Sequence, residues 1–382
     1  MKKICLALYC ILFLFTGIGR GEAQTEKPYV IGAVFAVTGH ASWLGAPERN
    51  TVKMLEEEVN SQGGINGHPI KVIIEDTKGD ETQAVKAVRK LIRQDGVLAI
   101  IGPSRTQTTL AVISIVGRYR VPLISCAAAE AIVKPVRKWT FKTPQTDSLA
   151  VEKIYQYMQK KGIKRIAIIT GITGFGAEGR RQLKKLAPKY GITIVADETY
   201  APKDTDMTPQ LIRIRKSNPQ AIVNWSILPG QAIVPKNMKQ LGMNIPLFQS
   251  HGFGNIKYVQ AAGEAAEGII FPAGRLLIVN FLPKTHPQYK VLLNYKEKYE
   301  SRFKERVSTF GGHAYDAFWL VVNALKAVGP DRAKIRSYIE NTKNFIGTGG
   351  IFNFSPKDHN GLNIDAFELL TVKNRDFVLL ED

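Results

Sequence analysis

The sequence predicts an α/β fold of two doubly wound lobes, in each of which helices flank a parallel sheet. Short apolar runs alternate with segments of helical periodicity along most of the chain, and this rhythm is typical of parallel sheets. The runs are rich in Ile and Val and mostly lack polar alternation, as strands buried on both faces do. A sheet of about six strands would be complete near residue 145. A second series begins near Leu149, after the irregular segment 142–147.

The expected strands are the apolar runs between the helical segments. Two helices have a clear apolar face, Pro47–Asn60 and Thr82–Gln94, with Val, Leu or Ile recurring every three or four residues. Thr82 and Thr208 are the predicted N-caps of their helices, since a threonine hydroxyl can accept from the first free amides. The strands are expected at Tyr29–Ala36, Ile70–Asp76, Leu98–Gly102, Pro122–Cys126, Arg165–Thr170, Thr193–Thr199, Ala221–Trp225, Pro246–Ser250 and Gly268–Pro272.

The first residues have the pattern of a cleaved export signal. Lys2 and Lys3 precede the apolar run Ile4–Phe15, and residues 21–23 supply the small side chains of a cleavage site. The run is shorter than the roughly 20 residues that a membrane-spanning helix needs. We therefore predict a signal peptide over residues 1–23 and a soluble protein that is exported to the periplasm.

The charge distribution argues against nucleic acid as a partner. The formal net charge is +19, from 52 Lys and Arg against 33 Asp and Glu. The basic residues are spread over many segments, where they alternate with apolar residues or Glu. That pattern is typical of solvated helix faces rather than of a nucleic-acid-binding stripe. A strongly positive surface nevertheless favours encounter with anionic ligands.

No catalytic, metal-binding or nucleotide-binding motif stands out. No His-Glu-x-x-His, Gly-x-Ser-x-Gly or Ser-x-x-Lys pattern occurs at a strand end, and none of the six histidines has metal-ligand spacing from another. Cys126 is interpreted as a buried thiol rather than a nucleophile. The turn from Gly171 to Gly176 partly fits a phosphate-binding motif, but Ala177 and Glu178 stand where Lys and Ser or Thr are needed. We predict neither an enzyme nor a cofactor.

Several short motifs follow one another in a characteristic order over nearly the whole mature chain. Gly63-Gly64 ends the first helix, and Asn66-Gly67 makes a tight turn into the next strand. The full set is Thr38-Gly39, Asn60–Gly67, Asp76–Asp80, Gly102-Pro103, Val121–Ser125, Phe175-Gly176 and Ala314–Ala317. Their order and spacing resemble the leucine–isoleucine–valine-binding family of bacterial periplasmic binding proteins.

The resemblance implies a domain organisation and a mode of action. It implies two lobes joined by three crossings, near Thr143, near Pro272 and between about 346 and 366. Lobe 1 would comprise residues 24–143 plus 273–355, and lobe 2 residues 144–272 plus 356–382. Such a protein is a monomer that closes on a small ligand and delivers it to the permease subunits of an ABC importer. A sensory module that presents a ligand to a signalling partner is the alternative.

The resemblance places one half of the site at the strand ends of lobe 1, where open α/β sheets bind ligands. In the family, a hydroxyl of the Gly-Pro loop and groups of the next loop hold a carboxylate. Arg105 either replaces a missing hydroxyl as a charged donor or points to solvent. The matching positions are Ser104, Arg105 and Thr106 in the first loop, Ala127 and Ala129 in the second, and Trp43 or Leu44 as a lid.

The other half lies at the strand ends of lobe 2. Phe175 matches an aromatic ligand contact of the family, and Ile227 or Leu228 stands where a second aromatic is usual. His251 occupies the position of the acid that pairs with an amino-acid ammonium. A histidine could instead donate to an acid, or it could cap the helix that follows. The favoured ligand is thus a carboxylate without an α-amino group, such as an organic or aromatic acid, with an aliphatic amino acid next.

Overall fold

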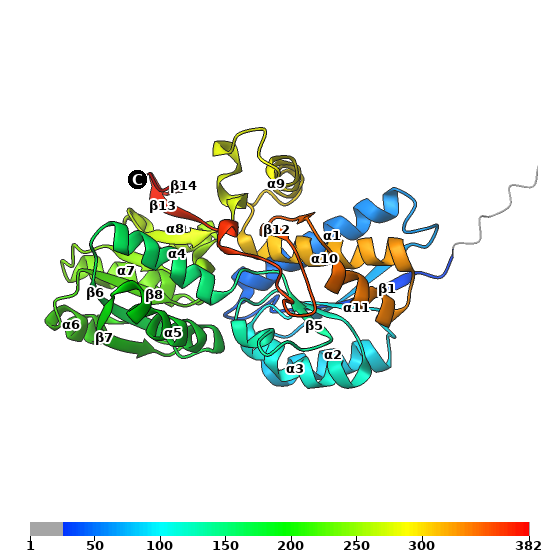
Figure 1. The fold of residues 1–382 in the computed structure, drawn as a ribbon, viewed down its shortest axis with the longest axis horizontal. Helices are drawn as coiled ribbons and strands as arrows, with labels where there is room; N and C mark the ends of the chain where they lie inside the picture. The colour runs from blue at the N-terminus through cyan, green and yellow to red at the C-terminus, as the bar shows by residue number, and fades with distance from the viewer. Residues whose placement is uncertain (1–25, 382) are drawn as a thin grey trace, which may run out of the picture.

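The computed structural model describes residues 26–381, so the predicted signal peptide lies outside the described residues. Two α/β lobes lie side by side, with lobe 1 mainly in blue, cyan and orange and lobe 2 mainly in green (Figure 1). The predicted fold class is confirmed. Over the described part of the chain, no helix combines the length and apolarity that a membrane crossing requires.

Lobe 1 is built on a parallel sheet in the order β2-β1-β3-β4-β5. The sheet has five strands rather than about six, and its last strand lacks an apolar run, which explains why the sequence did not reveal it. Along β1, successive side chains point to opposite faces of the sheet. Val34 packs against α2 and α3 on one face, whereas Ala33 and Phe35 pack against α1 and α10 on the other. The strands are β1 (Tyr29–Phe35), β2 (Ile70–Asp76), β3 (Ile100–Ile101), β4 (Leu123–Ser125) and β5 (Thr140–Lys142).

The helices of lobe 1 come from both ends of the chain. They are α1 (Ser42–Ser61), α2 (Glu81–Arg93), α3 (Thr106–Tyr119), α9 (Tyr289–Phe303), α10 (Thr309–Val328) and α11 (Arg332–Asn341). A small hairpin, β11 (Phe345–Ile346) with β12 (Ile351–Phe352), packs its Phe352 into the same core. The prediction of Thr82 as an N-cap is wrong, because the Asp80 carboxylate accepts from the Gln83 amide at 2.8 Å and caps α2.

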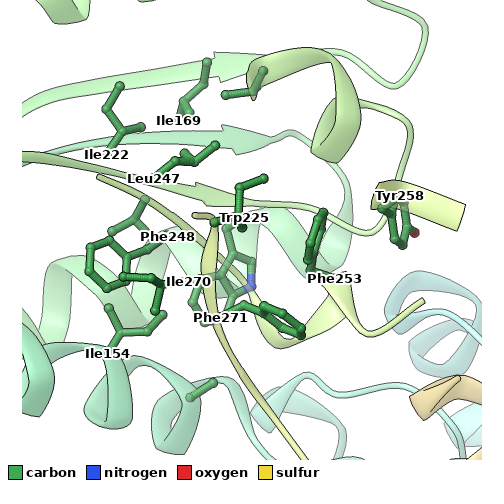
Figure 2. Close-up of a cluster of buried hydrophobic side chains, with 14 of the residues drawn as sticks. Ile154, Ile169, Ile222, Trp225, Leu247, Phe248, Phe253, Tyr258, Ile270 and Phe271 are labelled. Carbon is green, nitrogen blue, oxygen red and sulfur yellow. The ribbon is translucent and has the colours of Figure 1, made fainter. Parts of the chain in front are cut away.

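Lobe 2 has a mixed sheet in the order β14-β13-β10-β9-β8-β6-β7. Its parallel part is β6 (Arg165–Gly171), β7 (Thr193–Tyr200), β8 (Ala221–Trp225), β9 (Leu247–Gln249) and β10 (Ile270–Ala273). The end of the chain adds two antiparallel strands that the sequence did not reveal, β13 (Glu368–Lys373) and β14 (Asp376–Leu379). Ile154 from a helix packs near Phe248 and Phe271 from the sheet in the core (Figure 2).

The helices of lobe 2 are α4 (Asp147–Lys160), α5 (Gly174–Leu186), α6 (Thr208–Lys216), α7 (Gly230–Gln240) and α8 (Ile256–Ala262). The N-cap of α6 is Met207, so the prediction of Thr208 as the cap is wrong by one residue. Thr208 is the first helical residue instead, and its amide donates to the Asp206 carboxylate at 2.9 Å.

Hydrogen bonds tie the crossing segments between the lobes to one another. The Thr143 hydroxyl donates to the His313 carbonyl at 2.9 Å, and the Gln145 amide donates to the Gly349 carbonyl at 2.7 Å. Near the third crossing, Ala366 packs in the core of lobe 1 and Phe367 in that of lobe 2. The predicted lobe boundaries stay a prediction, and this packing favours a third crossing close to Phe367.

Candidate ligand-binding site

A small cavity lies between the lobes, where strand ends of both sheets face each other. It holds about 330 Å³ of space free of protein atoms, part of which is open to solvent. Its walls come from lobe 1, from the first crossing and from lobe 2. The lining residues are Leu44, Ser104, Thr106, Cys126, Ala127, Ala128, Pro144, Phe175, Ile227, His251, Gly252, Phe310 and His313.

The Gly-Pro loop of lobe 1 sets the position of Thr106. Gly102 has a φ of +90°, and a side chain there would collide with the Val34 carbonyl. Ser104 is already paired, since its hydroxyl accepts from the Ala36 amide at 3.0 Å and donates to the Glu48 carboxylate. Thr106 begins α3, and its buried hydroxyl has no partner among the described residues. Of the two hydroxyls, only that of Thr106 is therefore free to bind a ligand.

The second loop of lobe 1 contributes backbone and small side chains. The Ser125 hydroxyl accepts from the Ala127 amide at 3.1 Å, which fixes the turn after β4. Cys126 and Ala127 line the cavity, whereas Ala129 is buried beside it. Burial raises the pKa of the Cys126 thiol well above its ordinary value, with Glu48 adding to the effect. Its interpretation as a buried thiol is confirmed.

The glycine turn of lobe 2 positions Phe175. The Thr173 hydroxyl caps α5 by accepting from the Gly176 amide at 3.5 Å. A side chain at Gly176 would lie 1.8 Å from the Gly171 carbonyl oxygen, so the turn needs glycine there to fold back on the strand. The ring of Phe175 thereby reaches the cavity wall.

His251 lies at the end of β9, on the lobe 2 wall. Its ring is enclosed by Phe175, Trp225 and Phe367, with ring centroids 5.2 to 5.6 Å away. Neither ring nitrogen has a hydrogen-bond partner among residues 26–381. Burial, followed by the positive charge of Lys142 and by His313, lowers the pKa of His251 well below its ordinary value. The imidazole is therefore neutral.

The alternative that His251 caps the following helix is wrong. The cap of α8 is Asn255, whose side-chain oxygen accepts from the Lys257 amide at 3.0 Å. His251 belongs to a separate helical turn, His251–Phe253, and its side chain makes no hydrogen bond to that helix.

The first turn of α10 supplies two cavity residues that the sequence reasoning missed, Phe310 and His313. Their spacing of three places both on one face of the helix. Gly311 and Gly312 let this turn pack closely, because side chains there would meet the Tyr295 hydroxyl and Thr348. The Phe-Gly-Gly-His sequence just before the Ala314–Ala317 motif was the available signal.

The remaining predicted site residues lie outside the cavity wall. Trp43 contacts Tyr258 across the lobes, and its carbonyl accepts from the Asn255 amide at 2.9 Å, while its neighbour Leu44 lines the cavity. Leu228 is buried, and Ile227 lines the cavity in its place.

Arg105 takes neither of the two orientations considered from the sequence. Its guanidinium donates to the Gly79 carbonyl at 2.7 Å and lies 3.0 Å from the His40 ring. The residue is buried but does not line the cavity. It holds the loop before α2 against the start of α3.

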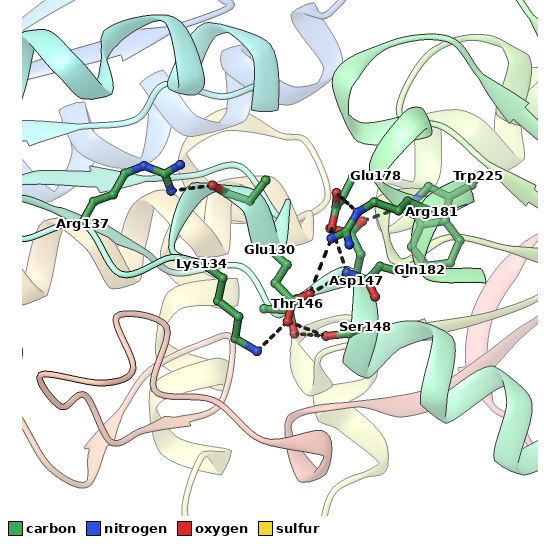
Figure 3. A network of polar contacts seen from close by, with 11 residues as sticks. Glu130, Lys134, Arg137, Thr146, Asp147, Ser148, Glu178, Arg181, Gln182 and Trp225 are labelled. Atoms are coloured by element: carbon green, nitrogen blue, oxygen red, sulfur yellow. Dashed lines mark hydrogen bonds and ion pairs between the residues drawn. The ribbon is translucent and has the colours of Figure 1, made fainter. Parts of the chain in front are cut away.

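A polar network bridges the lobes beside the cavity (Figure 3). Glu130 of lobe 1 accepts from the side chains of Ser148 and Gln182 in lobe 2, at 3.3 and 2.5 Å. It also pairs with Lys134 at 2.6 Å and lies 3.8 Å from Arg181. Burial acts to raise the pKa of Glu130, but its partners outweigh that and hold it below its ordinary value. This network, the Glu130 latch, holds the lobes together in the closed arrangement.

Comparisons with known proteins agree with this architecture. A sequence model described as "Periplasmic binding protein" matches residues 28–376. A Pseudomonas aeruginosa leucine-, isoleucine-, valine-, threonine- and alanine-binding protein is 23% identical over 309 residues, which are 80% of this chain and 79% of that protein.

Solved structures give the same result. An extracellular ligand-binding receptor from Rhodopseudomonas palustris HaA2 has a TM-score of 0.87 and 28% identity, covering 93% of this chain and 100% of that one. A branched-chain amino acid transporter substrate-binding protein from Streptococcus pneumoniae, in complex with isoleucine, has a TM-score of 0.82 and 25% identity, covering 93% and 100%. The chain therefore belongs to the family of periplasmic binding proteins, whose members bind small ligands and work with ABC transporter permeases.

Proposed function

We propose that this protein is the extracytoplasmic solute-binding component of an ABC importer and that its lobes close on a small organic or aromatic acid without an α-amino group. One observation carries the choice of ligand: within the described residues, the cavity wall contains no Asp or Glu. A buried ammonium without a carboxylate partner is costly. His251, a neutral imidazole, stands where that partner is expected.

The Thr106 side of the cavity suits a carboxylate. The N-termini of α3 and α5 approach each other there, since a side-chain carbon at Gly174 would lie 3.3 Å from the Thr106 methyl carbon. Helix N-termini carry partial positive charge and free amides, which favour an anion. The unpartnered Thr106 hydroxyl adds a donor. Phe175, Ile227 and Phe310 leave apolar space for the body of the acid.

An aliphatic amino acid is the second candidate. The printed names of the Pseudomonas and Streptococcus relatives assign such ligands to those proteins. Here an amino acid would place its ammonium against His251, whose neutral ring carries no negative charge to pair with it.

A ligand-binding panel distinguishes the two candidates. The protein is first unfolded and refolded to remove co-purified ligand, because a bound ligand masks further stabilisation. Leucine is then compared with 4-methylpentanoate, which differs only in lacking the amino group, and with benzoate, by thermal shift and calorimetry. We expect stabilisation by the acids. Stabilisation by leucine with none by any acid would overturn the ligand class.

Transport rather than sensing is tested separately. Proteoliposomes that contain the permease and ATPase subunits encoded beside this protein are expected to take up the bound acid only when the protein is added. Ligand binding without any such uptake would favour the sensory alternative.

A further inference from the structure

Two histidines from opposite lobes line the same cavity. His251 follows β9 in lobe 2, and His313 lies in the first turn of α10 in lobe 1. Both side chains are more than nine-tenths buried, with 6% of each exposed. The two rings thus face one cavity from opposite lobes. The closed cavity is therefore crossed by a pair of imidazoles.

Hydrogen-bonding groups of both rings are unused. Both nitrogens of His251 and Nδ1 of His313 are buried and have no partner within the described residues. Buried polar atoms in folded proteins are nearly always paired, and unpaired ones call for an explanation such as a ligand. By contrast, the buried His359 bonds to the Thr140 carbonyl and to Glu340 at 2.9 and 3.1 Å, as a structural histidine does.

The ring of His251 is enclosed, and the backbone at His313 is tied to the first crossing. His251 is enclosed by three aromatic rings. His313 is held by its helix, whose carbonyl at that residue accepts from the Thr143 hydroxyl of the first crossing. Closure of the lobes is thus what brings the two imidazoles together around a ligand.

The chemistry of the pair indicates what it binds. A neutral imidazole offers one N–H donor and one acceptor, so two of them suit a hydroxyl or a keto oxygen. An ammonium would find no carboxylate in the cavity wall of the described residues to pair with. The ligand's carboxylate is assigned to the Thr106 end of the cavity.

We propose that His251 and His313 together bind a second oxygen group of the ligand, so that the preferred ligand is a hydroxy or keto carboxylic acid. The inference rests on the proposed function, because it requires that the ligand be an acid. It adds a specificity determinant, His313, and a substrate class within the acids.

Matched ligands test the proposal on the ligand-free protein. The pairs are 4-methylpentanoate with its 2-hydroxy and 2-oxo derivatives, and benzoate with the 3- and 4-hydroxybenzoates. Calorimetry is expected to show at least tenfold tighter binding for an oxygenated member of one pair. His313→Leu is expected to reduce that preference to less than threefold. His313→Gln, which keeps a donor and an acceptor, retains part of it.

A control variant and a second measurement keep the test decisive. His286→Leu makes the same change in a half-buried residue outside the cavity and is expected to leave all affinities unchanged. If His313→Leu does not fold, ¹⁵N NMR of the histidine rings in the wild-type protein replaces it. Both rings are expected to shift with the oxygenated acid and not with its parent.

The outcomes separate the two proposals. Leucine binding without binding of any acid contradicts the proposed function. Acid binding with equal affinity within every pair leaves the proposed function standing and overturns the role of the histidine pair. A preference that survives His313→Leu unchanged, or ring nitrogens that do not shift, also overturns it.

Discussion

The two walls of the cavity present different chemical groups to a ligand. Lobe 1 presents the Thr106 hydroxyl, the start of α3 and small side chains, with Phe310 and His313 of α10 beside them. Lobe 2 presents rings, with Phe175 against His251 and Trp225 behind them. Backbone amides and a hydroxyl recognise a charge whatever the rest of the ligand is, whereas a ring must match the ligand's shape. We infer that the Thr106 side of the lobe 1 wall selects for a carboxylate and that the rings, those of lobe 2 above all, select for the body attached to it.

The substitution Thr106→Val tests this division of roles and is expected to have the largest effect. The substitution keeps the shape and removes the unpartnered hydroxyl, so a bound carboxylate loses one charge-assisted hydrogen bond, on the order of 1.5–3 kcal/mol. Calorimetry is expected to show binding weakened by about 10- to 100-fold for every acid. Thr108→Val is the matched control, because the Thr108 hydroxyl donates to the Arg105 carbonyl and is not in the cavity wall. Loss confined to one class of acid would contradict the assignment.

Phe175→Ala tests the lobe 2 wall. The ring is 2% exposed and packs against Trp225 and His251. Its loss is expected to weaken binding by about tenfold, since a stacked aromatic contact contributes on the order of 1 kcal/mol beyond its buried area. The loss should be greater for aromatic than for short acids, and Phe175→Leu should recover part of it. Unchanged affinity in a folded variant would refute the role of this ring.

The substitution Glu130→Gln tests the contacts that hold the lobes together rather than the ligand contacts of either cavity wall. It removes the charge that pairs with Lys134 and faces Arg181 across the lobes, while Gln182 can still donate. Because partly exposed ion pairs contribute about 1 kcal/mol or less, we expect ligand dissociation to speed up by about fivefold for all acids. Stopped-flow measurements check this. Glu152→Gln, which breaks a pair with Lys189 inside lobe 2, is expected to change nothing.

The histidine pair makes stability depend weakly on pH. Burial and Lys142 lower the pKa of His313 to about 3, so this ring stays unprotonated in the folded protein. In the unfolded chain the same ring takes up a proton near the ordinary histidine pKa of 6.5. Stability is therefore lost as the pH falls. Between pH 7 and pH 6 the loss is about 0.7 kcal/mol for this group. His313→Leu should reduce the loss by that amount in urea unfolding, and an unchanged difference would contradict a buried neutral ring.

Local patterns predicted much of the fold and part of the site. Apolar runs placed the parallel strands to within a few residues, and the family resemblance proposed Thr106, Phe175 and His251, which line the cavity. His313 was missed because α10 returns to the cavity from more than 150 residues downstream of the first crossing, and only the glycine pair before it hinted at a close approach. The direction of Arg105 depends on the Gly79 carbonyl, a tertiary contact that no local pattern encodes.

One side chain of the cavity can report how often the lobes open. Among residues 26–381 the free cysteine is Cys126, whose thiol lines the cavity and is kept protonated by burial. Because the thiol is only 3% exposed, we expect an alkylating reagent to reach the sulfur mainly when the lobes separate. The rate at which the Cys126 thiol is labelled therefore reports the frequency of lobe opening in the wild-type protein. A ligand that closes the lobes should lower the rate of Cys126 labelling in proportion to the fraction of time for which it keeps them closed.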